Sequence, residues 1–132
     1  MKTFGLTVLS PEKEIFKGEA LSVSVPTLLG DIEVFPDHSA NLSVLAPGYM
    51  AIHREGEDSL RYFVTGGYID ITKTVNVVAD HVMSVDEVTS DYLLQEKANQ
   101  EALLARSDKI DDKAFDRASD ALARYNQMLE AV

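Results

Sequence analysis

The 132-residue sequence contains no cysteine, so disulfide bonds and thiolate metal sites are both excluded. It also lacks any apolar run of about 20 residues, the length that a membrane-spanning helix requires. No apolar segment of signal-peptide length follows Met1. We therefore expect a soluble protein that does not insert into a membrane and reaches one only through a partner.

Basic residues are scarce: 12 Lys and Arg stand against 22 Asp and Glu, which gives a formal net charge of −10. Nucleic acids and anionic lipid surfaces both attract basic proteins. The charge balance therefore argues against both as partners and leaves a basic protein partner open. The length is sufficient for one hydrophobic core and too short for two large domains.

Short segments of alternating apolar residues, bounded by Pro, Gly, Asp and Ser, occupy the first two-thirds of the chain. Period-two apolarity of this kind predicts β-strands that are buried on one face. The segments are 4–8, 15–16, 21–25, 31–36, 42–46, 49–52, 60–64, 68–71, 75–79 and 82–85. Many short strands at close spacing predict an antiparallel sandwich or barrel.

Glycine and proline are both absent from Thr89 to Val132, where Ala, Leu, Glu, Gln, Lys and Arg dominate. These residues are strong helix formers, so the composition changes from strand to helix near Asp86. We therefore expect a strand domain over 1–86 and a hairpin of two helices over 87–132.

One face of the first predicted helix carries Leu94, Ala98, Ala102 and Ala105. The second predicted helix has an apolar face on a 3-4 pattern, at positions 115, 118, 122, 125, 129 and 132. An interface lined by alanine buries little apolar area, and burial contributes roughly 25 cal/mol per Å². We therefore expect the two helices to be held together only weakly.

The connection between the two helices offers start signals for the second one. Asp111 can cap its N-terminus, and Ile110 can pack on Phe115 one turn later. Basic and acidic side chains alternate along this helix, which is typical of a solvated face. The like-charge pairs Asp112–Asp116 and Lys113–Arg117 at i,i+4 favour an intermolecular partner instead, and both interpretations stay open.

Two Asp-His pairs, Asp37-His38 and Asp80-His81, are the candidates for catalysis or metal binding. Their spacing matches no metal-ligand motif, and no GxSxG element accompanies them. Gly66-Gly67 lacks the neighbours of a phosphate-binding loop and is interpreted as a turn with positive φ. The residues alone therefore predict no catalytic, cofactor or metal site.

Two segments resemble the epsilon subunit of F-type ATP synthases: VSVPTLLGDIEVFPDHSANLSVLAPG at 23–48 and YFVTGGYIDITKTVNVVADHV at 62–82. The first is similar to the family's glycine-containing loop, Pro-x-His corner and Pro-Gly ending. The second is similar to its Gly-Gly hairpin and following strand. The resemblance covers the whole chain and implies an α+β fold, with an N-terminal antiparallel β-sandwich followed by a C-terminal antiparallel two-helix hairpin.

The function implied by the resemblance is that of a non-catalytic rotor subunit of the central stalk, peripheral to the cytoplasmic face of the cell membrane. The sandwich would bind the gamma subunit and the c-ring and couple ion-driven rotation of the ring to ATP synthesis. The interface residues carried over from the family are Leu29, Gly30, Asp31 and His38.

The helical hairpin of this family can extend toward the alpha and beta subunits and inhibit ATP hydrolysis. The resemblance therefore implies a regulatory arm, with partners in those subunits. The residues assigned to it are Ala98, Ala102, Ala105, Lys113, Arg117, Leu122, Arg124 and Tyr125.

Some members of the family bind ATP through an Ile/Leu-Asp-x-x-Arg-Ala motif at the start of the first helix. The matching stretch here is LLQEKA, from Leu93 to Ala98. Leu94 stands in place of the aspartate and Lys97 in place of the arginine, so the carboxylate and the bidentate phosphate ligand are both missing. No cofactor is expected.

Two other classes of function remain open. One is a free-standing sandwich that binds a small ligand and associates through its helices. The other is an enzyme that uses Asp37, His38 and His81.

Overall fold

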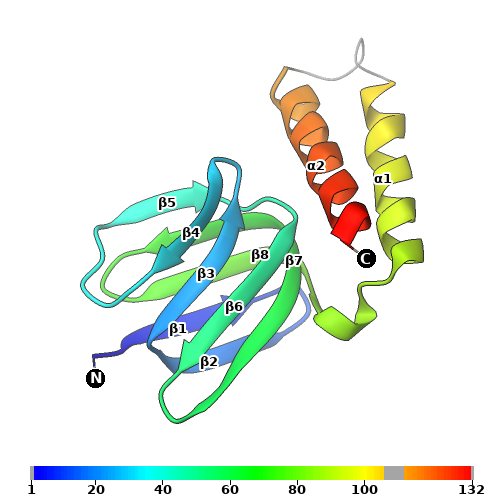
Figure 1. Ribbon diagram of the computed structural model, residues 1–132. Coiled ribbons are helices and arrows are strands. Elements are labelled where there is room, and N and C mark those ends of the chain that lie inside the picture. Colours follow the sequence, from blue (N-terminus) through cyan, green and yellow to red (C-terminus); the bar gives the residue numbers. More distant parts are fainter. Residues whose placement is uncertain (1, 106–111, 132) are drawn as a thin grey trace. The chain divides into compact units, whose positions relative to one another are not determined.

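The computed structural model describes residues 2–105 and 112–131. The chain divides into two compact units, Met1–Val85 and Asp86–Val132 (Figure 1). The first unit is built from strands and the second from helices. The predicted class, a β-sandwich followed by a two-helix hairpin, is confirmed.

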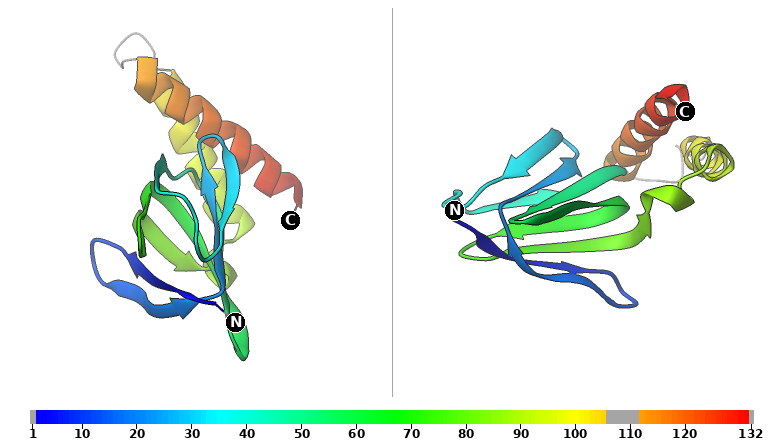
Figure 2. Two further views of the ribbon diagram at one scale, coloured as in Figure 1. Left: turned by 90° about the vertical axis from the view of Figure 1, so that its left-hand side faces the viewer. Right: turned by 60° about the horizontal axis from the view of Figure 1, so that its bottom comes forward.

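Eight strands form one strongly curled sheet in the first unit (Figures 1 and 2). Their bounds are β1 (Phe4–Leu9), β2 (Glu14–Ala20), β3 (Ser22–Thr27), β4 (Gly30–Val34), β5 (Asn41–Val44), β6 (Gly48–Arg54), β7 (Glu57–Ile71) and β8 (Val75–Ser84). The strand order is β2-β1-β8-β7-β6-β3-β4, and β5 pairs with β7 beside this path. Neighbours are antiparallel except for β1 and β8, which are parallel.

The curled sheet encloses a single, mostly aliphatic core to which every strand except β5 contributes a buried side chain. The alternation predicted for β1 is present, because Phe4, Leu6 and Val8 are buried while the residues between them are not. Where β2 leads into β3, the Leu21 N–H donates to the His53 carbonyl at 2.8 Å, which ties this corner to β6.

Strand β7 corrects the interpretation of Gly66-Gly67 as a turn. Both glycines have positive φ, 61° and 101°, but they lie inside one 15-residue strand, and the turn follows at 72–74. Val64 and Ile69 on either side are both buried, although five positions separate them. The two glycines therefore shift the phase of the alternation without interrupting the strand.

Strand β8 shows the same shift opposite the glycines. Ala79 is buried and Val82 packs against the core, three positions further on, and the strand is continuous through Asp80. The predicted segments 75–79 and 82–85 are thus one strand, as are 60–64 and 68–71.

The second unit begins with a short 3₁₀ turn, η1 (Val85–Glu87), followed by α1 (Ser90–Leu104) and α2 (Asp112–Ala131). Thr89 caps α1: its hydroxyl oxygen accepts a hydrogen bond from the Tyr92 N–H at 3.1 Å. The two helices pack against each other as a hairpin (Figure 2). No helix within 2–105 and 112–131 is both long and apolar enough to span a membrane.

The prediction that the alanine-lined face of α1 packs against α2 is wrong. Ala98, Ala102 and Ala105 are all exposed, and the buried residue of α1 is Leu93. Among the side chains of α2 that the structure describes, the buried ones are Ala118, Ala121 and Tyr125. The predicted cap at Asp111 and the contact of Ile110 with Phe115 lie outside the described residues and side chains.

Candidate functional site: an exposed hairpin tip and a polar corner

The β3–β4 connection is a two-residue hairpin tip, Leu28-Leu29, fixed by the side chain of Thr27. The buried Thr27 hydroxyl donates to the Gly30 carbonyl at 2.5 Å and accepts from the Leu29 N–H at 3.3 Å. Gly30 closes the turn with a φ of 116°, a conformation that favours glycine. Leu29 is 99% exposed, so a large apolar side chain is presented to solvent from a hydrogen-bonded turn.

The tip is joined to β5 by backbone hydrogen bonds. The Leu28 N–H donates to the Val44 carbonyl at 3.1 Å, and the Ala46 N–H donates to the Pro26 carbonyl at 3.0 Å. The position of the tip is therefore set by β5 as well as by β3 and β4.

Beside the tip lies a set of exposed apolar side chains on β5 and β7, here called the apolar face: Leu42, Val44 and Tyr68. Val44 and Tyr68 are paired across the two strands, and all three are exposed, at 68%, 43% and 44%. The period-two pattern predicted Leu42 and Val44 as strand residues but did not show that they point outward. A cluster of exposed apolar side chains on one face is a candidate interaction surface.

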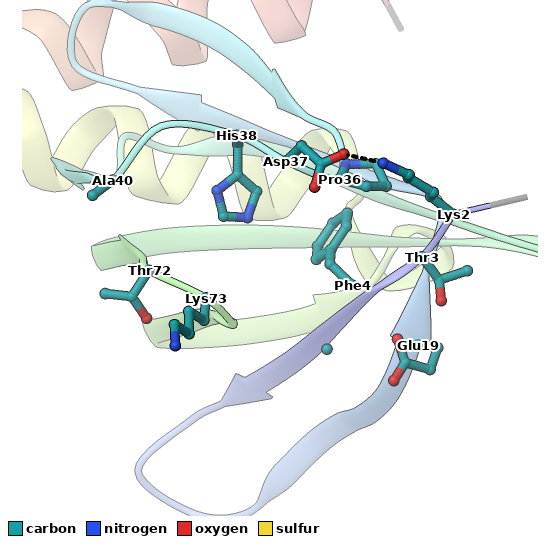
Figure 3. A pocket seen from close by; sticks show the side chains of 11 residues that line it. Lys2, Thr3, Phe4, Glu19, Pro36, Asp37, His38, Ala40, Thr72 and Lys73 are labelled. Atoms are coloured by element: carbon teal, nitrogen blue, oxygen red, sulfur yellow. Dashed lines mark hydrogen bonds and ion pairs between the residues drawn. The ribbon is translucent and has the colours of Figure 1, made fainter.

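The Pro36-Asp37-His38 corner connects β4 to β5 and lines an open pocket of about 740 Å³ (Figure 3). Asp37 has a φ of 65°, and its carboxylate pairs with Lys2 Nζ at 2.8 Å. The hydrogen bond between the two side chains, followed by the attraction of their opposite charges, lowers the pKa of Asp37 and raises the pKa of Lys2. Both side chains are exposed, so the pair adds little to stability.

His38 points into this pocket over Phe4. The two rings meet edge to face at a centroid distance of 5.7 Å and an angle of 84° (Figure 3). Within the described part of the chain, its Nδ1 atom is buried without a hydrogen-bond partner. The pocket wall carries charges of both signs, Lys73 and Glu19 besides the Lys2–Asp37 pair, which is not a pattern selective for one type of ion.

The described residues include no group of three or more His, Asp or Glu that could hold a metal ion. The second Asp-His pair lies in β8, where His81 pairs with Thr65 of β7. The Asp80 side chain lies next to Gly66 of β7, at the point where the alternation of both strands changes phase. The structure thus accounts for this pair as part of the β7–β8 ladder.

The structure separates the four interface residues carried over by resemblance. Leu29 is in the tip, Gly30 and Asp31 begin β4 next to it, and His38 follows the other end of β4 (Figure 1); from here on the tip includes Gly30 and Asp31. A strand of this length spans about 17 Å. The tip and the corner are therefore two separate surfaces.

The charged residues assigned to the arm differ in their surroundings. Lys113 and Arg117 are exposed on α2, whereas Arg124 Nε is paired with Asp120 Oδ2 at 3.0 Å. Leu122 is half-buried, and Tyr125 is buried. Burial, followed by the nearby Glu96 carboxylate and then Tyr92, raises the pKa of Tyr125 well above its ordinary value.

Residues 3–85 match the family model of the ATP synthase delta/epsilon chain β-sandwich domain. The ATP synthase epsilon chain of Jannaschia sp. (strain CCS1) is 35% identical over 128 residues, which cover 96% of this chain and 90% of that protein. The epsilon chain of Chromohalobacter salexigens is 33% identical over 133 residues, covering 100% of this chain and 93% of that one.

Two solved structures share the fold at low sequence identity. A chain in the cryo-EM structure of the Euglena gracilis mitochondrial ATP synthase (OSCP/F1/c-ring) aligns with a TM-score of 0.72 at 19% identity, covering 98% of this chain and 81% of that one. A chain of the Tetrahymena thermophila mitochondrial ATP synthase central stalk and c-ring gives a TM-score of 0.65 at 18% identity, with coverages of 92% and 97%. By its sandwich domain and by its near full-length relatives, the chain belongs to the epsilon chain family of ATP synthase.

Proposed function

We propose that the protein is a non-catalytic rotor subunit of the ATP synthase central stalk, peripheral to the cytoplasmic face of the cell membrane. Its sandwich binds the gamma subunit and the c-ring and turns with them. The observation that carries the proposal, besides the family, is the tip: Leu29 is fully exposed on a turn that Thr27 holds in place. An exposed leucine on an ordered turn is suited to insertion between the loops of a partner.

In this arrangement the tip residues Leu29, Gly30 and Asp31 face the polar loops of the c-ring. The carboxylate of Asp31 is suited to a basic loop, as is the net charge of −10. His38 contacts a different part of the stalk, because β4 separates it from the tip.

The gamma subunit is assigned to the apolar face, Leu42, Val44 and Tyr68. This surface is continuous with the tip through the Leu28–Val44 hydrogen bond. A folded protein partner can cover apolar side chains, whereas polar ring loops cannot satisfy them as well. One sandwich can thus contact both partners at adjacent surfaces.

Two charge reversals test the tip. Asp31→Lys in the assembled enzyme should weaken the coupling of ATP hydrolysis to ion pumping in membrane vesicles and leave the sandwich folded, because changes at exposed surface positions usually cost under about 0.5 kcal/mol. The matched control is Asp58→Lys, an exposed carboxylate at the start of β7. Equal coupling in both variants would contradict the assignment of the tip.

The division into 1–86 and 87–132 assigns assembly to the sandwich and regulation to the arm. A chain ending at Asp86 should fold and copurify with gamma as the full chain does. A chain that folds but no longer binds gamma would contradict this division, and a stable homodimer of the full chain without gamma would favour a free-standing binding protein.

The helical arm is proposed to inhibit ATP hydrolysis by extending toward the alpha and beta subunits. Exposed Lys113 and Arg117 can meet acidic partners there, and exposed Ala98, Ala102 and Ala105 leave room for close approach of a partner helix. Deleting residues 88–132 should raise the ATP hydrolysis rate of the isolated complex and leave synthesis largely intact. An unchanged hydrolysis rate would make the arm purely structural.

A further inference from the structure

We propose that the aromatic ring of Tyr125 is the anchor that keeps the two helices of the arm closed. The inference deepens the proposed regulation by the arm and rests on it for its biological meaning. According to this proposal, the packing of the two helices depends on one side chain of α2 and not on Ala98, Ala102 and Ala105 of α1.

The buried side chains described on α2 form one face: Ala118, Ala121 and Tyr125 follow at intervals of three and four positions. Two of these are alanines, which supply little apolar area. Tyr125 is 2% exposed and is among the largest fully buried side chains in the described chain. Among the fully buried side chains described on α2, one ring therefore supplies most of the apolar area.

The ring of Tyr125 lies against α1. Glu96 and Tyr92, both on α1, are close enough to act on the Tyr125 hydroxyl electrostatically. Near the ring, α1 has half-buried Tyr92 and Glu96, and its one fully buried described residue is Leu93, whereas its alanines are exposed. No second large buried side chain on the described part of α2 can replace the ring.

Opening the hairpin would expose the whole ring and the surface of α1 beneath it. Truncating a buried aromatic residue to alanine removes both its transfer free energy and its packing. The closed and open arms therefore differ in the environment of this residue more than in that of any other residue of the described α2.

The absence of cysteine allows two labels to be introduced without background. Ala98→Cys and Ser119→Cys place one exposed site on each helix, and electron paramagnetic resonance of paired spin labels reports the distance between them. The full-length, isolated chain should give one short distance when the hairpin is closed.

In this labelled background, Tyr125→Ala should raise the ratio of open to closed arm by at least about a hundredfold. Tyr125→Phe keeps the ring and should leave the short distance unchanged. The matched control is Gln127→Ala, an exposed position on the same helix, which should also leave it unchanged. Far-ultraviolet circular dichroism shows whether α2 remains helical in each variant.

A Tyr125→Ala arm that stays closed would overturn the proposal, as would a Tyr125→Phe arm that opens as far as the alanine variant. If the alanine variant loses its helices altogether, Tyr125→Leu provides the test: it keeps the helix and must show a partial shift to the open distance. An unchanged distance in that variant would equally overturn the anchor.

The same variants in the assembled complex separate the anchor from the function of the arm. If Tyr125→Ala opens the isolated chain and lowers the hydrolysis rate of the complex, both the anchor and the inhibitory arm are supported. If it opens the chain but leaves hydrolysis unchanged, the anchor stands and the proposed regulation fails. If deleting the arm raises hydrolysis while Tyr125→Ala leaves the hairpin closed, the regulation stands and the anchor fails.

Discussion

The sandwich and the hairpin use apolar side chains in opposite ways. In the sandwich, mostly aliphatic residues from seven strands share one core, so each contributes a small part of a large buried area. In the hairpin, the buried side chains described on α2 are two alanines and one tyrosine. The sandwich is therefore redundant in its packing, whereas the described part of the hairpin has few fully buried side chains.

The largest expected effect is at the phase shift in β7. A Cβ at Gly67 would overlap the Val78 carbonyl oxygen and lie 2.8 Å from Ala79 Cα, both of which are backbone atoms, and the residue has a φ of 101°. Gly67→Val should cost more than about 5 kcal/mol and leave no folded sandwich. The dispersion of amide signals in NMR spectra shows whether the sandwich of this variant is folded.

Gly5→Ala is the matched control for that substitution. Its Cβ would meet Thr74 Cγ2 at 3.5 Å, an ordinary contact, so the folded spectrum should persist. A folded Gly67→Val chain would show that β7 can be straight at this point.

The second effect concerns the shared core. Ile52 of β6 is fully buried, and Ile52→Ala should lower the free energy of unfolding of the sandwich by about 2–5 kcal/mol. Leu94→Ala on the exposed side of α1 is the counterpart in the hairpin and should change the stability of the chain by under about 0.5 kcal/mol. Urea unfolding followed by circular dichroism measures both, and equal losses would remove the contrast between the two regions.

The third effect lies within the hairpin. Ala118 on α2 is buried, and Ala118→Gln adds a polar side chain where there is no space for it. We expect the closed arm to lose about 1–3 kcal/mol, which spin-label distances between the helices would show as a larger open fraction.

The smallest effect is expected on the alanine stripe. Ala102 is exposed, so Ala102→Gln should change the closed population by an amount equivalent to under about 0.5 kcal/mol. If Ala102→Gln increased the open fraction of the hairpin as much as Ala118→Gln does, the exposed alanines of α1 would have to be part of the helix–helix interface.

The strands could be predicted from the sequence because a period of two assigns each residue to a face. The prediction failed where the period changes phase: Val64 and Ile69 cannot lie on one face of a regular strand, so a break was inferred at the glycines. Only the backbone shows that positive φ at Gly66 and Gly67 accommodates the change within the strand.

The face of α1 could not be predicted, because alanine is equally suited to a close helix contact and to solvent. The tip residues were found by resemblance, but the hydrogen bonds of Thr27 and the outward orientation of Leu42 and Val44 depend on strand pairing far along the chain. The separation of His38 from the tip depends on the length and direction of β4. These features are set by tertiary structure, and no local pattern encodes them.

Strand β7 has a mechanical consequence. Its first half pairs with β6, its second half with β5, and β8 runs beside both halves. A force applied at β5 is therefore carried to β6 along the covalent backbone of one strand, because no loop interrupts β7. To move β5 relative to β6, the sheet has to bend β7 together with its ladder to β8.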